Sequence, residues 1–196
     1  MLIDPSNKQK FIEQLNHNFR TVLSYGEDEG LVPAGQFIIK DIQEDEIPSE
    51  YSSRMADFQF ANVILTKVDD ENVQIVLPMT TFLREYSDTA TRNADKLALG
   101  SDLSLSVEDI ERMAEEKVLN DETLQELIEA DTISLDESGA EYIINGEVQS
   151  SNYSICPINL GKYRERIREK TIEREPEGRV KGENKNYNYY GEGLDR

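Results

Sequence analysis

Short runs of β-branched and aromatic residues, separated by a few turn-forming polar residues, recur along this chain of 196 residues. One run at residues 57–68 and another at 73–77 are separated by the acidic segment 69–72. Because polar, turn-prone residues between two β-rich runs are typical of a tight reversal, we predict an antiparallel hairpin near 57–77.

A second hairpin is predicted near 132–148. Two apolar runs, at residues 132–135 and 140–144, flank a polar turn, and Asn145-Gly146 favours a type I′ reversal into a further short strand. Hairpin connections of this kind outnumber helical crossovers in the chain. The predicted fold class is therefore α+β, with a small, mainly antiparallel sheet.

The N-terminal segment has the spacing of an amphipathic helix. Asp4-Pro5-Ser6 supplies residues that start helices, and apolar residues then recur at intervals of one, three and four. These apolar residues are Phe11, Ile12, Leu15, Phe19, Val22 and Leu23. We predict one N-terminal helix that ends near Gly26.

A helical hairpin is predicted between residues 106 and 129. Ser106 followed by Asp109 resembles a capping box, and Asp121 is suited to cap a second short helix. Between the sheet segments and this hairpin, residues 80–86 are expected to form a helical turn. The mostly polar residues 87–95 are expected to form a loop.

Charge is divided unevenly along the chain. Residues 1–160 hold 11 basic and 32 acidic side chains, a net charge of −21, whereas residues 161–196 hold 10 basic and 8 acidic side chains, a net charge of +2. We therefore divide the sequence into an acidic α+β body, 1–160, and a charged, Tyr/Asn/Gly-rich C-terminal arm, 161–196. So acidic a body argues against a surface that binds nucleic acid or an anionic membrane.

The arm begins with cations at every second position. They are Lys162, Arg164, Arg166, Arg168 and Lys170. In an extended segment all five would point to the same side, whereas in a helix they would interleave with glutamates at three- and four-residue spacing. The sequence leaves the helical and the extended conformation open for residues 161–175.

The rest of the arm, from residue 175, has almost no aliphatic side chains and cannot bury enough apolar surface to fold alone. Tyr187, Tyr189 and Tyr190 are clustered within it, and aromatic side chains are frequent anchors of protein interfaces. We therefore predict an extended arm that docks on a neighbouring subunit. Its five cations and three tyrosines are the predicted partner-binding residues.

The chain lacks most of what a catalytic or metal site requires. With one cysteine, Cys156, and one histidine, His17, it can build neither an internal disulfide framework nor a site with two imidazoles. His17 lies about 200° around the predicted helix from Leu15 and is expected to be exposed, while Cys156 is expected to pack as a small apolar residue. The sequence has no glycine-rich phosphate loop and no EF-hand loop. We predict no cofactor, no metal and no enzymatic activity.

Three functions from different classes remain as hypotheses. The first is a non-catalytic structural subunit of a larger complex, such as a bacteriophage connector, neck or tail-completion protein, because these commonly combine a small body with an arm. The second is an acidic inhibitor that mimics nucleic acid and binds a basic partner. The third is an enzyme that uses carboxylates, with or without a divalent metal.

Partners and location follow from the same features. Other protein subunits, identical or different, are the expected partners of the arm. Nucleic acid is a weaker alternative for the arm, because Glu165, Glu169 and Glu173 interrupt its cations. The sequence has no run of 18 apolar residues, and we expect a protein of the cytoplasm or of a virus particle rather than of a membrane.

Overall fold

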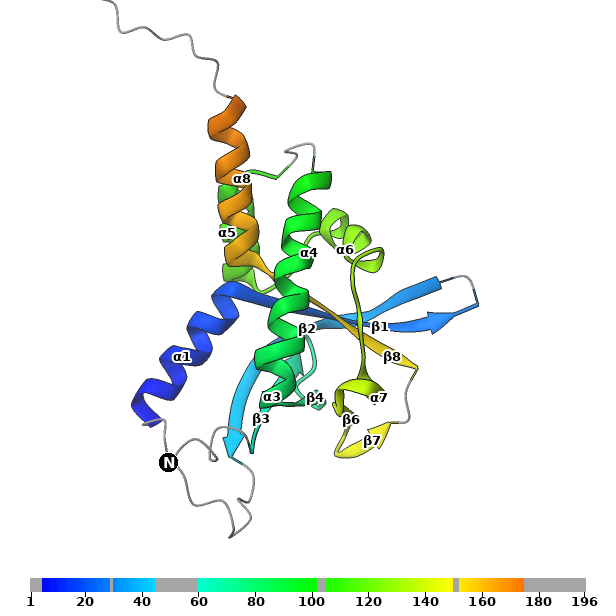
Figure 1. Ribbon diagram of the computed structural model, residues 1–196. Helices are drawn as coiled ribbons and strands as arrows, with labels where there is room; N and C mark the ends of the chain where they lie inside the picture. The colour runs from blue at the N-terminus through cyan, green and yellow to red at the C-terminus, as the bar shows by residue number, and fades with distance from the viewer. Residues whose placement is uncertain (1–4, 29, 45–59, 102–104, 150–151, 175–196) are drawn as a thin grey trace, which may run out of the picture.

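The computed structural model describes residues 5–28, 30–44, 60–101, 105–149 and 152–174. Its helical elements are α1 (Pro5–Asn18), α3 (Met79–Thr81), η1 (Phe82–Tyr86), α4 (Ser87–Gly100), α5 (Val107–Glu116), α6 (Asp121–Ile128), α7 (Leu135–Ser138) and α8 (Leu160–Arg174). Its strands are β1 (Phe19–Glu27), β2 (Gly30–Glu44), β3 (Ala61–Lys67), β4 (Val73–Pro78), β5 (Ile133–Ser134), β6 (Glu141–Ile144), β7 (Glu147–Gln149) and β8 (Tyr153–Asn159). They form one antiparallel sheet in the order β5-β8-β1-β2-β3-β4-β6-β7, so the predicted α+β class is confirmed (Figure 1).

The long strands β1 and β2 lie near the centre of the sheet. β1 pairs with β8 on one side and with β2 on the other, and residues 20–24 are all buried. The pairing of β2 with β3 shifts by one residue between Ile39 and Asp41, which is a β-bulge. Because a bulge reverses the alternation of side chains, Phe37, Ile39 and Ile42 all enter the same core.

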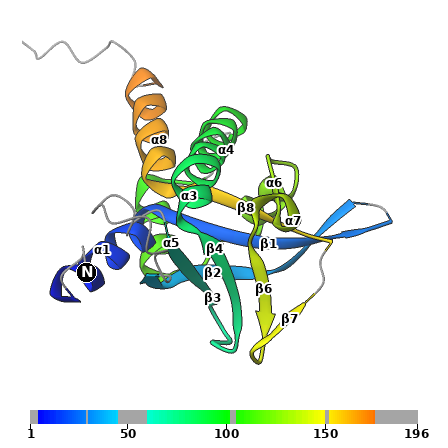
Figure 2. The same cartoon turned by 60° about the horizontal axis from the view of Figure 1, so that its bottom comes forward.

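Two apolar cores lie on opposite faces of β1 and β8. Leu23 and Ile155 belong to the first core, whereas Val22 and Cys156, which are next to them in sequence, belong to the second. Side chains of α1, α3, η1 and α7 close the first core, and side chains of α4, α5, α6 and α8 close the second. The backbone of α4 and α8 beside the sheet can be followed in Figure 2. Cys156 is fully buried and packs as the small apolar residue that was predicted.

The hairpin predicted near 57–77 is confirmed as β3 and β4. The turn at Asn145-Gly146 is also confirmed: both residues have positive φ, 50° and 82°, and they join β6 to β7. However, the expected pairing of residues 132–135 with 140–144 is wrong. Instead, β5 pairs with β8 at one edge of the sheet, and β6 pairs with β4. The short helix α7 connects β5 to β6, and its Leu135 is buried in the first core.

The N-terminal helix is confirmed, but it ends at Asn18 rather than near Gly26. Asn16 fixes its last turn to β2, since its Nδ2 donates to the Ile39 carbonyl at 2.6 Å and its Oδ1 accepts from the Ile39 amide at 2.8 Å. From Phe19 onward the chain forms strand β1, whose main chain hydrogen-bonds to β2 and β8 rather than within a helix. The apolar spacing predicted too long a helix, because a strand buried on both faces does not alternate between apolar and polar residues.

Residues 87–95, predicted as a loop, are helical and belong to a segment that runs without a break from Met79 to Gly100. The buried face of α4 consists largely of small and polar residues, which give a weak periodic signal in the sequence. These residues are Thr89, Ala90, Asn93, Ala94, Leu97 and Ala98. The helical turn predicted at 80–86 is confirmed, and it includes the π-helical turn η1.

The predicted helical hairpin is confirmed as α5 and α6. Ser106 forms the capping box: its Oγ accepts from the Asp109 amide at 3.1 Å, and the Asp109 carboxylate accepts from the Ser106 amide at 3.2 Å. The cap of α6 is Asn120 rather than Asp121, because the Asn120 side chain accepts from the Thr123 amide at 2.8 Å.

Asn93 joins α4 to two other segments, and we expect its replacement by alanine to destabilise the fold by about 3 kcal/mol. Its Nδ2 donates to the carbonyls of Pro157 at 2.8 Å and Asp131 at 3.0 Å, and its Oδ1 accepts from the Asp131 amide at 3.0 Å. Asn93→Ala leaves these main-chain groups unpaired in a fully buried site. The measurement is urea unfolding, with the exposed α6 variant Gln125→Ala as a control that should stay within about 0.5 kcal/mol of the parent. An Asn93→Ala variant as stable as this control would contradict the prediction.

Candidate functional site

The predicted arm begins as a helix. α8 contains all five cations of the alternating run, so the helical alternative is the one that the structure adopts. Leu160, Tyr163 and Ile167 recur at spacings of three and four and are buried in the second core. The predicted boundary after residue 160 therefore divides a packed helix, and residues 161–174 belong to the body rather than to an extended arm.

Three of the five cations form ion pairs with acidic side chains of the same chain. The pairs are Lys162–Glu165 (2.8 Å), Arg166–Asp95 (2.7 Å) and Arg168–Glu111 (3.0 Å). The second pair joins α8 to α4 and the third joins it to α5. Exposed pairs of this kind stabilise weakly, so they orient α8 while the buried apolar face holds it in place.

Arg164 and Lys170 bond at the C-terminal ends of other helices. At the end of α1, Arg164 donates to the His17 carbonyl at 3.2 Å and to Asn18 Oδ1 at 3.0 Å. At the end of α4, Lys170 Nζ donates to the carbonyl of Ala98. Helix C-termini expose unpaired carbonyls with a partial negative charge, so both cations stabilise the ends that they contact.

The structure thus places all five predicted cations against their own chain. Arg164 is 6% exposed and its guanidinium is committed to α1. The binding of these cations to a neighbouring subunit stays a prediction. Tyr187, Tyr189 and Tyr190 lie outside the described residues.

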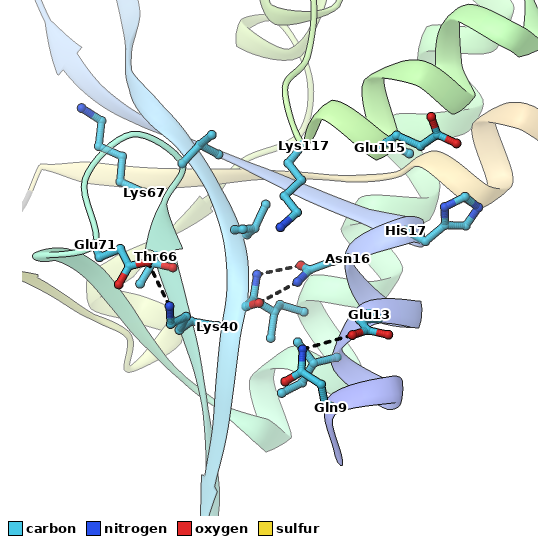
Figure 3. A pocket seen from close by; sticks show the side chains of 15 residues that line it. Gln9, Glu13, Asn16, His17, Lys40, Thr66, Lys67, Glu71, Glu115 and Lys117 are labelled. Carbon is cyan, nitrogen blue, oxygen red and sulfur yellow. Dashed lines mark hydrogen bonds and ion pairs between the residues drawn. The ribbon is translucent and has the colours of Figure 1, made fainter. Parts of the chain in front are cut away.

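A pocket of about 590 Å³ lies between α1, β2 and the C-terminal end of α5 (Figure 3). Its lining includes Glu13 and His17 of α1 and Lys40 of β2. It also includes Glu71, in the turn after β3, and Lys117, which directly follows α5. Lys40 Nζ and Glu71 Oε1 form an ion pair at 3.0 Å across one side of the pocket. The position of α1 is set by the bonds between Asn16 and Ile39, which form part of the pocket wall.

His17 lies at the edge of this pocket and its side chain is exposed, as the helical spacing predicted. Partial burial, reinforced by the positive charge of Arg164, lowers the pKa of His17. The imidazole is therefore mainly neutral at pH 7. The pocket combines this neutral imidazole with ammonium and carboxylate groups, a set suited to binding a small polar molecule.

Sequence reasoning missed this pocket, because its residues come from segments far apart in the chain. One local feature marks a residue of the pocket. Lys117 directly follows the last residue of α5, at a position where helices commonly end with a glycine. Lys117 adopts the left-handed conformation there, with φ 63° and ψ 20°. Only Lys117 and Asn145 have positive φ among the non-glycine residues of the described ranges.

Two kinds of site are absent from residues 5–28, 30–44, 60–101, 105–149 and 152–174. No group of three or more His, Cys, Asp or Glu side chains there is arranged to hold a metal ion. No helix within these ranges is long and apolar enough to cross a lipid bilayer.

Gly161 lies where α8 meets α1, and we expect Gly161→Ala to destabilise the fold by about 1 to 2 kcal/mol. A Cβ at this position would lie 2.8 Å from Asn18 Oδ1 and 3.2 Å from Asn159 Oδ1. Both oxygens are occupied, because Asn18 accepts from Arg164 and Asn159 accepts from the Lys162 amide at 2.9 Å. The displaced side chains should outweigh the helix propensity gained from alanine, which is about 1 kcal/mol.

Gly100→Ala at the end of α4 is the matched control, because no atom lies within 4 Å of its Cβ position. It should leave the urea midpoint unchanged or raise it. If both alanine variants raise the midpoint, the close contact between α8 and α1 is not needed for stability.

Cys156 should not react with thiol reagents in the folded protein. It is fully buried, and this burial raises the pKa of its thiol to about 11, so the thiolate is scarce at pH 8. Alkylation by iodoacetamide, followed by intact mass measurement, should proceed only after the chain is unfolded in urea. Rapid labelling of the native chain would show that β8 opens readily.

Comparison of the chain with models of protein families, with curated proteins and with solved structures finds no match in any of the three. The arguments for a function therefore come from the residues and from the geometry described above.

Proposed function

We propose that this chain is a non-catalytic assembly subunit that binds a neighbouring subunit through the segment after α8. In this proposal α8 is a rigid stem that belongs to the body, and residues 175–196 are the binding segment. Tyr187, Tyr189 and Tyr190 are its anchors.

One observation carries the proposal: α8 rises away from the sheet beside α4, and its C-terminal end at Arg174 lies far from the sheet (Figures 1 and 2). Near this end Ile172 is 72% exposed, and Leu99 at the end of α4 is 79% exposed. Residues 175–196 follow directly on this end of α8 in the sequence. In the proposal, the neighbouring subunit binds them there.

The anchoring of α8 supports the same proposal. Tyr163 and Ile167 are each 1% exposed, and Arg166 and Arg168 pair with α4 and α5. A stem fixed at several points gives the proposed binding segment a defined point of attachment. Binding then costs ordering entropy only for the segment itself, which lowers the cost of association.

A virus particle remains the proposed setting, with bacteriophage connector, neck or tail-completion proteins as the suggested class. These proteins share the plan of a small body with an attached binding segment. No arrangement of the described residues favours the acidic inhibitor or the carboxylate enzyme over this proposal.

The proposal is tested by ending the chain after Arg174. The shortened chain should keep the thermal unfolding midpoint of the full chain, because α8 and both cores stay intact. It should also lose association, measured by sedimentation of the purified chain and by cross-linking within the native particle. A chain ending at residue 160 would not separate these effects, since it also removes Tyr163 and Ile167 from the second core.

A triple variant refines this test. Changing Tyr187, Tyr189 and Tyr190 together to serine should weaken association more than a hundredfold, at about 1 kcal/mol or more for each aromatic anchor. The control changes Asn184, Asn186 and Asn188 to serine in the same segment and should weaken association far less. Equal association of the full, shortened and triple-serine chains would refute the proposal.

A further inference from the structure

The pocket between α1, β2 and the end of α5 contains a concentration of the body's few cations. Residues 1–160 hold 11 basic side chains, and three of them line this one pocket. They are Lys40, Lys67 and Lys117. Three glutamates line the same pocket, so its lining has a formal charge of zero, and a small anion meets less repulsion there than it would on average over a body with a net charge of −21.

Two of these lysines already have anionic partners. Lys40 Nζ lies 3.0 Å from Glu71, and Lys67 Nζ lies 3.3 Å from Asp69. The Lys117 backbone amide donates to the Met113 carbonyl at the end of α5, but the Lys117 ammonium forms no hydrogen bond and no ion pair with any residue in the described part of the chain. Figure 3 shows its side chain reaching over the pocket toward Asn16, whereas Glu115 points away from it.

The backbone at Lys117 adds a separate observation. Its φ of 63° places it in the left-handed region, where an L side chain is strained and glycine is not. A left-handed residue is a common way to end a helix, but it is usually a glycine, and non-glycine residues in strained conformations are often found at ligand-binding positions. Here the left-handed backbone sets the direction in which the Lys117 side chain leaves the main chain beside the pocket.

We propose that this pocket binds a small organic anion whose carboxylate or phosphate group pairs with Lys117 Nζ. The volume of about 590 Å³ lies in the range of small-molecule sites. Glu13 and Glu71 also line the pocket, so the ligand carries one anionic group together with hydroxyl or ammonium groups that donate to these carboxylates. The evidence for this site does not rest on the proposed role in assembly.

The test is a titration of the full chain, followed by amide chemical shifts, with three probes. Inorganic phosphate, glycerol 3-phosphate and L-serine separate a bare phosphate, a hydroxylated phosphate and a carboxylate that carries an ammonium group. We expect glycerol 3-phosphate or L-serine to cause saturable shifts at Asn16, Lys40 and Lys117. Saturation by none of the three probes, or by inorganic phosphate alone, would overturn the proposal.

Matched variants separate specific pairing from general charge. Lys117→Gln should weaken binding at least about tenfold, because a charged hydrogen bond is lost. Lys10→Gln removes the same charge from an exposed position on α1 outside the pocket lining and should leave the affinity unchanged. Equal effects of the two variants would count against a bond to Lys117.

Lys117→Gly tests whether a lysine at this left-handed position makes the folded protein less stable than a glycine would. It should raise the thermal midpoint by about 2 to 4 °C, because glycine adopts this conformation without strain. The same variant should lose the response to the anion. A lower midpoint would show that the Lys117 side chain serves the fold itself and would overturn the assignment.

Discussion

Arg20 is buried where α1, β1 and α5 meet, and much of the architecture depends on how its charge is accommodated. Its side chain is 1% exposed, and its guanidinium donates to the carbonyls of Asn16, Phe19 and Ala114. Asn16 and Ala114 belong to the last turns of α1 and α5, so the negative ends of two helix dipoles face this cation. Burial lowers the pKa of Arg20 to about 10, which still leaves the group charged at neutral pH. The helix ends must therefore stay in place, since moving either one would take a carbonyl partner away from a buried charge.

The same principle explains why the predicted arm is partly body. Arg164 and Lys170 in α8 bond at the ends of α1 and α4, as Arg20 does at the ends of α1 and α5. Composition suggested that residues 161–196 act as a single unit that needs a partner. However, Tyr163 and Ile167 give the first part a buried face, and its cations find partners among the acids and carbonyls of the chain itself. A mean charge over 36 residues could not show this, because the packed face of α8 depends on only a few side chains.

Local chemistry predicted the fold wherever a turn or a cap determined the structure. The capping box at Ser106 and the reversal at Asn145-Gly146 need only residues that are close in sequence, and both are confirmed. Prediction from the sequence failed where the residues that contact one another lie far apart along the chain. The predicted N-terminal helix runs on to near Gly26 and so includes most of β1, because the pairing of this strand with β2 and β8 is not encoded in its own spacing. The pocket was missed for the same reason, since α1, β2 and the end of α5 meet only in the folded chain.

The proposed assembly role and the proposed anion site make different demands on stability. A stem that presents a binding segment works best when it is rigid, and α8 has the buried contacts and capped neighbours that provide this rigidity. A ligand site can instead retain local strain, as at Lys117, provided that the surrounding structure is stable enough to impose it. The bonds between Asn16 and Ile39 serve both demands, because they hold α1 as one wall of the pocket while its C-terminal end receives Arg164 from α8. Ligand binding beside α1 would therefore act on the helix that also supports the stem, so an anion in the pocket should stabilise the contact between α1 and α8.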